Sequence, residues 1–249
     1  MLNKIIFSGL CISISAHVFA LTETEQKQVN QLVQLFQKND VQKISQQIRY
    51  PLIREVPIPA IQNDAEMQKR FHQVFDQKLM QKIAKSKESQ WTSMGWRGLM
   101  LDGGTIWFDG SKITAVNYSG VKEQQIKLQY IEQQKRALHT SLKTFKAPIF
   151  SFKTKGFLVR IDEMPNGKYR YASWKVNQQQ SDKPSLVLNN GKVTFEGSGG
   201  NHHYDFVSGT HRYIVERMVL GSNETPELTL TVTQRGKAIL KQTGKLVAN

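Results

Sequence analysis

The amino-acid sequence predicts an α+β protein in which helices and a curved sheet precede an all-antiparallel β sandwich or barrel. In the first third of the chain, apolar residues recur at three- and four-residue steps, which is the spacing of one helix face. From Ile149 onward they recur at every second residue, and turn signals follow about every ten residues. We therefore expect a signal peptide in residues 1–20, an α+β domain in 21–120, a helical connector and linker in 121–148 and an antiparallel β domain in 149–249.

The first twenty residues have the three-part pattern of a secretory signal peptide. Lys4 supplies the positive charge, an apolar run extends from Ile5 to Ala16, and Val18 and Ala20 precede a predicted cleavage after Ala20. The apolar run has about a dozen residues, whereas a membrane-spanning helix needs roughly 20. An N-terminal membrane anchor is the alternative interpretation, but the pattern favours export to a bacterial periplasm.

The only cysteine, Cys11, lies within this predicted signal peptide. Leu10 stands where a lipoprotein signal has a small residue, so we do not expect lipid attachment. Cleavage would leave a mature chain without a disulfide, a thiolate zinc site or a cysteine nucleophile. We expect no cofactor, no bound metal and no transmembrane span in that mature chain.

The chain is strongly basic, with a formal net charge of +14 at pH 7. More than half of this excess falls in residues 140–249, and a basic surface attracts polyanions. In the periplasm these would be an acidic protein, an anionic wall polymer of the envelope or the phosphates of lipid headgroups. Nucleic acid does not fit the compartment or the dispersed Lys and Arg residues. General solubility of an exported protein is the alternative explanation of the charge.

Capping signals mark the predicted helices of the first domain. Thr22–Glu25 reads as a capping box that begins the first helix. Asn39-Asp40 ends this helix and can cap a second, and Asn63-Asp64 can cap a third whose apolar residues continue to Ile83.

Glycine-rich turns mark the predicted strands that follow. Asp102-Gly103-Gly104 and Asp109-Gly110 separate three short apolar runs, which predicts a three-stranded antiparallel meander. Residues 121–142 are Gln-rich with apolar positions at helical spacing, so we expect a connector helix partly packed on the first domain. Residues 143–148 would link it to the β domain.

Five turn signals recur in the β domain, and their spacing of roughly ten residues predicts about eight strands over its length. These signals are Asn166-Gly167, Asn189-Asn190-Gly191, Gly197–Gly200, Ser208-Gly209 and Arg235-Gly236.

The order of elements in roughly residues 22–120 resembles the nuclear transport factor 2-like fold. The matching residues are Tyr50-Pro51-Leu52, Arg70-Phe71 with Phe75, Trp96-Arg97-Gly98 and Gly104–Phe108. The resemblance implies a cone of helices against a curved sheet. Such cones host binding proteins, isomerases, dehydratases and bacterial immunity proteins, so the fold alone does not select a function.

The C-terminal half resembles a β module of uncharacterised exported bacterial proteins. The residues that carry this resemblance are Val159–Asp162, Tyr169–Trp174, Lys183-Pro184 with Leu186–Leu188, Gly197–Gly200 and Tyr204–Phe206. This resemblance implies an architecture and no catalytic residues.

An enzyme built on the cone would need a polar pair inside it, typically a carboxylate with Tyr or His. The residues available for such a pair are Tyr50, Asp64, His72, Asp76 and Tyr118. No spacing places two of them in one pocket, so we predict no catalytic residue.

Two pairs of residues in the β domain are candidates for binding. His202 and His203 are candidate metal ligands. However, neighbouring residues on a strand point to opposite faces, and zinc needs three or four ligands, so we do not expect them to bind one ion. Alternation also places Arg170 and Trp174 on one face of a strand, opposite Tyr169 and Tyr171. If the tyrosines form the core, Arg170 and Trp174 could be an exposed pair that contacts a partner or a sugar. The alternative is that both sets are buried or have no binding role.

These observations favour a non-enzymatic periplasmic binding protein that presents a basic surface to an acidic partner. An inhibitor or immunity protein directed against an envelope-targeting enzyme is the most concrete form of this hypothesis. The alternatives are a small-molecule binder or a hydrolase or isomerase that uses the cone cavity, and an envelope scaffold that binds anionic wall or lipid.

Overall fold

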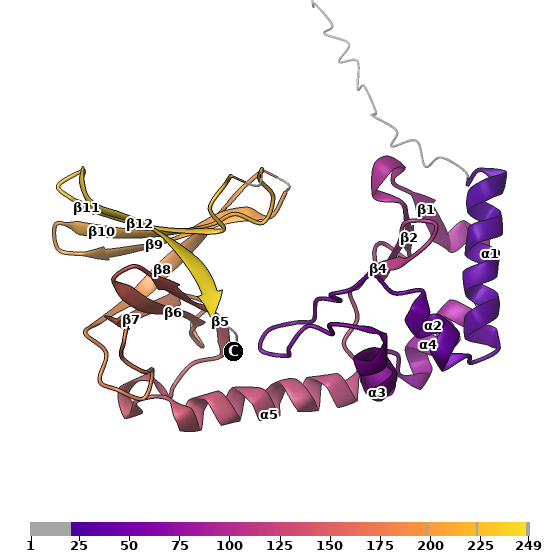
Figure 1. The fold of residues 1–249 in the computed structure, drawn as a ribbon, viewed down its shortest axis with the longest axis horizontal. Coiled ribbons are helices and arrows are strands. Elements are labelled where there is room, and N and C mark those ends of the chain that lie inside the picture. The colour runs from indigo at the N-terminus through magenta and orange to yellow at the C-terminus, as the bar shows by residue number, and fades with distance from the viewer. Residues whose placement is uncertain (1–20, 198, 223, 248–249) are drawn as a thin grey trace, which may run out of the picture. The chain divides into compact units, whose positions relative to one another are not determined.

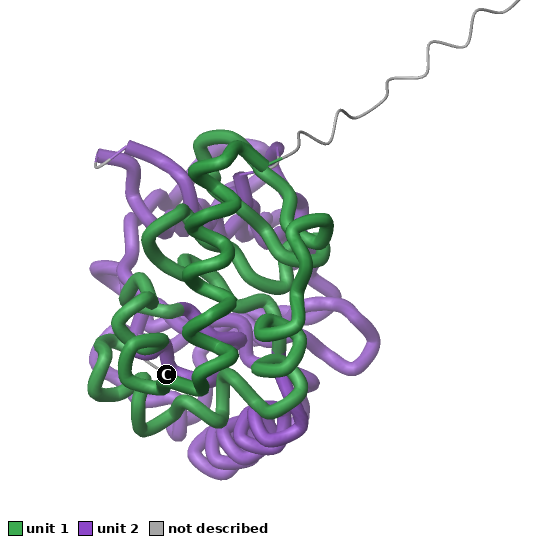
Figure 2. The backbone as a smooth tube through the Cα atoms, turned by 90° about the vertical axis from the view of Figure 1, so that its right-hand side faces the viewer, with its two compact units in different colours: residues 1–52, 62–118 green, residues 53–61, 119–249 purple. Residues whose placement is uncertain are grey.

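The computed structural model describes residues 21–197, 199–222 and 224–247 (Figure 1). The predicted signal peptide and its cleavage site lie outside the described residues. Backbone contacts divide the chain into a first unit, residues 1–52 and 62–118, and a barrel unit, residues 53–61 and 119–249 (Figure 2). The short segment 53–61 therefore leaves the first unit and joins the barrel unit.

Four helices form the helical part of the first unit over its described residues; α1 packs against α4 and α2 packs against α3. Thr22 and Glu25 form the predicted capping box, and Asp40 and Asn63 accept backbone N–H groups at the starts of the second and third helices. These three helix starts are confirmed. The helices are α1 (Glu23–Gln37), α2 (Val41–Gln46), α3 (Asp64–Val74) and α4 (Gln77–Ala84).

The prediction of one continuous third helix as far as Ile83 is wrong. The side chain of Asp76 accepts a hydrogen bond from the backbone N of Leu79 at 2.9 Å and thereby starts α4 as a separate helix. An aspartate at this position competes with the helical ladder of the preceding turn, which is why the apolar stripe continues while the backbone breaks.

The sheet of the first unit is a four-stranded antiparallel meander in the order β1-β2-β3-β4. The prediction of three strands omitted β1, whose three residues pair with β2 and are joined to it by a 3₁₀ turn, η2 (Gly95–Arg97), instead of a glycine pair. Another 3₁₀ turn, η1 (Glu88–Gln90), precedes β1. The strands are β1 (Trp91–Ser93), β2 (Leu99–Leu101), β3 (Ile106–Phe108) and β4 (Ile113–Val116).

The predicted connector forms helix α5 (Val121–Ala137) and a 3₁₀ turn, η3 (Thr140–Leu142), both within the barrel unit. Ile131 of α5 packs with Leu158 and Trp174 of the barrel wall. The connector is therefore grouped with the β domain by its contacts, in contrast to the predicted boundary. None of the described helices combines the length and apolar character needed to cross a membrane.

The β domain is a closed antiparallel barrel of eight strands, so the prediction of an antiparallel sandwich or barrel is confirmed in its barrel form (Figure 1). Each strand pairs with the next along the chain, and β12 closes the barrel by pairing with β5. The strands are β5 (Ala147–Thr154), β6 (Phe157–Glu163), β7 (Tyr169–Lys175), β8 (Leu186–Glu196), β9 (Asn201–Ser208), β10 (His211–Arg217), β11 (Leu228–Gln234) and β12 (Lys237–Val247).

Three of the five predicted turns lie between strands and a fourth, Ser208-Gly209, begins at the last residue of β9, but Asn189-Asn190-Gly191 lies inside β8. Asn190 has φ of 62°, and the register of β7 against β8 shifts at this point. The signal therefore marks a bend that lets the first half of β8 pair with β7 and the second half pair with β9.

Apolar and aromatic residues fill the barrel interior. Phe152, Ile161, Tyr171 and Phe206 belong to one buried cluster together with residues of β8 to β11. Burial raises the pKa of the Tyr171 hydroxyl to about 12. The period of two in the sequence thus corresponds to alternate residues pointing into this core.

Gly191 leaves the space that a core aromatic ring occupies. A Cβ atom added at Gly191 would lie 2.1 Å from Cε1 of Phe206. We expect Gly191→Ala to lower the free energy of unfolding by about 1–3 kcal/mol because the ring must move within a packed core. Gly156→Ala is the matched control, since its Cβ would meet only the end of Gln242 at 3.5 Å. Urea denaturation of both variants tests this, and equal stability would contradict the expected overpacking.

Candidate functional site

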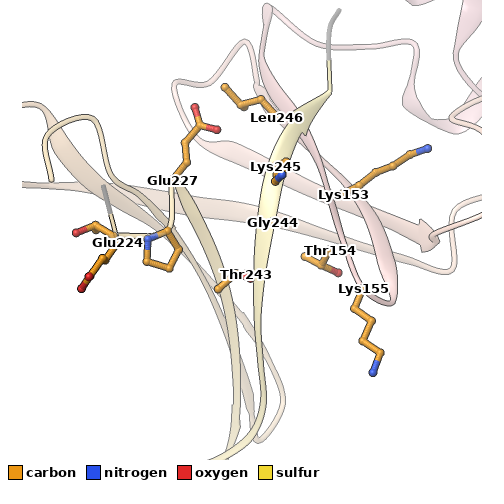
Figure 3. A pocket seen from close by; sticks show the side chains of 11 residues that line it. Lys153, Thr154, Lys155, Glu224, Glu227, Thr243, Gly244, Lys245 and Leu246 are labelled. Carbon is orange, nitrogen blue, oxygen red and sulfur yellow. The ribbon is translucent and has the colours of Figure 1, made fainter. Parts of the chain in front are cut away.

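A groove with a volume of about 770 Å³ lies at the seam where the barrel closes (Figure 3). The pairing of β11 with β12 begins at Leu228 opposite Gly244. Beyond Gly244, β12 continues to Val247 along β5, while the chain that precedes β11 diverges as the loop 224–227. The groove therefore crosses the last residues of β12, which pair with β5 on one side.

Three lysines line this groove. Lys153 of β5 and Lys245 of β12 are register partners, and Lys155 follows in the turn after β5. Directly opposite residues of an antiparallel pair have Cβ atoms about 5 Å apart, and like charges there destabilise the sheet. All three side chains are exposed, and none forms an ion pair within residues 21–197, 199–222 and 224–247.

Two carboxylates lie on the other side of β12 from Lys153 and Lys155 (Figure 3). Glu227 is held by Arg217, whose Nη1 lies 3.0 Å from Glu227 Oε1. Glu224 lies in the same loop. The groove therefore has a basic wall of three lysines and an opposite wall in which one carboxylate is already neutralised.

Gly244 allows the close approach of the two strands at the seam. A Cβ atom there would lie 2.7 Å from Cδ2 of Phe152 and 3.0 Å from the backbone oxygen of Lys153. The absence of a side chain at Gly244 thus leaves room for the Phe152 ring and the β5 backbone, while the strand register pairs Lys245 with Lys153.

The predicted exposed Arg170–Trp174 pair is wrong, because both side chains are buried. Arg170 is 3% exposed and Trp174 is 0% exposed. Helix α5 and the chain that follows it cover this part of the barrel wall, and Trp174 Nε1 donates to the backbone oxygen of Asp182 at 2.8 Å. The open alternative, in which both faces of β7 are buried, is the one observed.

His202 and His203 point to opposite faces of β9. His203 Nδ1 lies 3.0 Å from Glu196 Oε1, while the His202 ring lies between Phe195 and Tyr204, with centroid distances of 5.2 and 5.3 Å. The structure does not bring the two rings together. Within the described part of the chain, no group of three or more His, Cys, Asp or Glu side chains could hold a metal ion.

Of the polar candidates in the first unit, the structure joins Asp76 and Tyr118. The Tyr118 hydroxyl donates to Asp76 Oδ2 at 2.7 Å, and burial together with this carboxylate raises the pKa of Tyr118 to about 12. The other oxygen of Asp76 caps α4. The pair thus orders the start of α4, and both oxygens of the carboxylate are engaged.

The remaining three candidates have separate positions. The Tyr50 hydroxyl donates to the backbone oxygen of Ser45 at 2.9 Å, and burial raises its pKa. His72 lines a cavity of about 330 Å³ with Phe36 and Met80. Asp64 is the first residue of α3.

No motif in the sequence singles out the three lysines of the groove. Their signal is the concentration of positive charge in residues 140–249, but the pairing of Lys153 with Lys245 depends on the register between strands distant in sequence. Comparisons with protein-family models, with curated proteins and with solved structures give no match. The geometry and charge of the groove therefore carry the inference of function.

Proposed function

We propose that this protein is a non-enzymatic periplasmic binding protein that holds an acidic segment of a partner protein in the groove at the β5–β12 seam. An inhibitor or immunity protein against an envelope-targeting enzyme is the form of this function that we favour. The observation that carries the proposal is the cross-strand pair Lys153 and Lys245, with Lys155 beside it, along a groove of about 770 Å³.

The physical argument rests on an unfavourable arrangement within the free protein. Two directly opposed lysines cost stability, and nothing in the described part of the chain neutralises them. A carboxylate of a partner placed between them would interact with both ammonium groups and remove their repulsion. The resulting complex would form fast and would weaken as salt is added, because the charges lie at the surface.

The proposal also includes export of the protein to the periplasm and a cone fold for the first unit. The pattern of residues 1–20 supports cleavage after Ala20 and a periplasmic location. Four helices and a four-stranded antiparallel sheet support an interpretation of the first unit as a nuclear transport factor 2-like cone. Detection of the cleaved chain in the periplasmic fraction tests the first of these points.

Charge reversal in the groove should separate binding from stability. In the double variant Lys153→Glu/Lys155→Glu, we expect the affinity for an oligoglutamate peptide to fall at least about tenfold, as measured by calorimetry at low salt. Lys245→Glu places a carboxylate opposite Lys153, so it should weaken peptide binding while slightly raising the melting temperature. If Lys245 served only to stabilise the fold, its replacement would not weaken peptide binding while raising the melting temperature.

The matched control is Lys168→Glu/Lys237→Glu, which changes the net charge equally at two exposed positions outside the groove, one before β7 and one at the first residue of β12. Equal loss of binding in both double variants would show that only the overall charge matters and would overturn the groove assignment. Tighter binding to purified cell wall or to anionic vesicles than to the peptide would overturn the assignment of a protein partner and favour a scaffold.

A further inference from the structure

A second charged site lies beneath helix α5, on the outer wall of the barrel. It contains two guanidinium groups and one carboxylate, all buried: Arg160 and Arg170 are 3% exposed and Asp162 is 0% exposed. Arg160 Nε lies 2.8 Å from Asp162 Oδ1, and Arg170 Nη2 lies 2.6 Å from Asp162 Oδ2. With the carboxylate ionised, the cluster has one positive charge in excess.

Neutral oxygens hold the outer edge of Arg160. Its Nη1 donates to Gln180 Oε1 at 3.1 Å and its Nη2 donates to Gln134 Oε1 at 3.0 Å. Among the ion pairs of the described residues, Asp162 is the single carboxylate that reaches Arg160. Burial has the largest effect and lowers the pKa of Arg160, whereas the nearby carboxylate of Asp162 raises it. The net lowering is expected for a buried guanidinium whose charge is incompletely neutralised.

The Nη atoms of Arg170 also donate to neutral groups, whereas its Nε is buried without a hydrogen-bond partner among the described residues. Its Nη2 and Nη1 donate to the backbone oxygens of Leu142 at 2.8 Å and Thr144 at 3.0 Å. Both guanidiniums lie over the ring of Phe145, at 5.1 Å for Arg160 and 6.0 Å for Arg170. Arg170 is thus held by the chain that follows α5, whereas the Nη atoms of Arg160 lie beside Gln134 and Gln180, which line a cavity.

A cavity of about 310 Å³ opens on this edge of Arg160. Its wall includes Arg160 together with Gln134 and Gln180, the two side chains that hold its Nη atoms. Exposed Ala137 and Ser181 line the same cavity. A volume of this size suits a small ligand that is held by a few placed polar groups.

We propose that this cavity binds a small carboxylate, with Arg160 as the charged anchor and Gln134 and Gln180 as flanking amides. A guanidinium presents paired N–H donors that match the two oxygens of a carboxylate. The bound carboxylate would cancel the excess charge of the buried cluster. This site is separate from the groove at the seam and does not depend on the function proposed for it.

The ligand could be a sugar acid or the free carboxyl end of a peptide, and the test uses both. Glucuronate is compared with glucose, and a trialanine acid is compared with its amide. NMR titration follows the side-chain amides of Gln134 and Gln180 and the Nε–H of Arg160, up to about ten times an expected dissociation constant of about 1 mM. We expect saturable shifts with at least one acid and none with its neutral counterpart.

Two variants test the geometry without removing the buried cluster. Gln180→Glu adds a carboxylate beside Arg160 Nη1, so it should raise the melting temperature and abolish binding of the external acid. Ser181→Trp fills the cavity and should weaken binding at least tenfold. The matched controls are Gln133→Glu and Gln133→Trp at an exposed position of α5 outside the cavity, and both should bind as the natural protein does.

The outcomes separate this proposal from the groove. Equal shifts with acid and neutral compound, no saturable shift with either acid, or full binding by Gln180→Glu and Ser181→Trp would overturn the carboxylate site. The double variant Lys153→Glu/Lys155→Glu should retain the binding of the small acid even if it loses the acidic peptide. If it loses the small acid as well, the lysines are the binding groups and the proposed cavity is wrong.

Discussion

Asp162→Ala is expected to destabilise the barrel unit more than any other single replacement of a polar residue. Its carboxylate lies between Arg160 and Arg170 and is fully buried. The variant would leave two like charges buried together without their shared counter-ion, which lowers the free energy of unfolding by about 3–5 kcal/mol. Urea denaturation, monitored by near-ultraviolet circular dichroism, measures the change through the aromatic residues of the barrel.

Asp205→Ala is the control for the loss of one carboxylate. Asp205 also pairs with an arginine, Arg212, but the side chain of Arg212 is 51% exposed. We expect Asp205→Ala to lower the free energy of unfolding by less than about 1 kcal/mol, because solvent screens the pair and hydrates the remaining guanidinium. A similar loss in both variants would contradict the role assigned to burial.

A triple variant distinguishes the loss of charge balance from the loss of packing. Arg160→Met/Asp162→Leu/Arg170→Met removes all three charges and keeps much of the side-chain volume. Replacement of a buried ionic cluster by apolar residues is often neutral or stabilising. We therefore expect the triple variant to be more stable than Asp162→Ala alone, and the reverse order would contradict the electrostatic explanation.

Glu123→Ala is expected to have the second largest effect, because it breaks a buried ion pair that holds residues 53–61 on α5. Arg54 Nε donates to Glu123 Oε1 at 2.8 Å, and the two side chains are 3% and 1% exposed. Removal of the carboxylate leaves the charge of Arg54 buried beside α5, at a cost of about 3–5 kcal/mol. We also expect faster amide hydrogen exchange in residues 53–61, because this pair fastens that segment to the barrel unit.

Glu55 provides a control in the same segment. Its carboxylate pairs with Lys127 of α5, but the side chain of Glu55 is 62% exposed. Glu55→Ala should change the stability by less than about 1 kcal/mol and should leave the exchange of residues 53–61 nearly unchanged. Equal exchange in the Glu123 and Glu55 variants would contradict the assignment of the fastening role to Arg54 and Glu123.

The sequence by itself determined the local features of this fold. Thr22, Asp40 and Asn63 start helices because a side-chain oxygen reaches a backbone N–H three residues away. Alternating apolar residues and turn signals predicted an antiparallel barrel or sandwich of about eight strands. These features depend on interactions between residues a few positions apart, so the sequence alone is sufficient to predict them.

The tertiary structure decided which side chains are covered and which charges meet. Arg170 and Trp174 alternate as an exposed pair would, but α5 and η3 bury them, and no local pattern records what covers the outer face of a strand. Lys153 and Lys245 are far apart in sequence and become partners through the register that closes the barrel. Strand register and coverage are set by contacts between distant segments, which is why both candidate binding sites became visible in the folded chain alone.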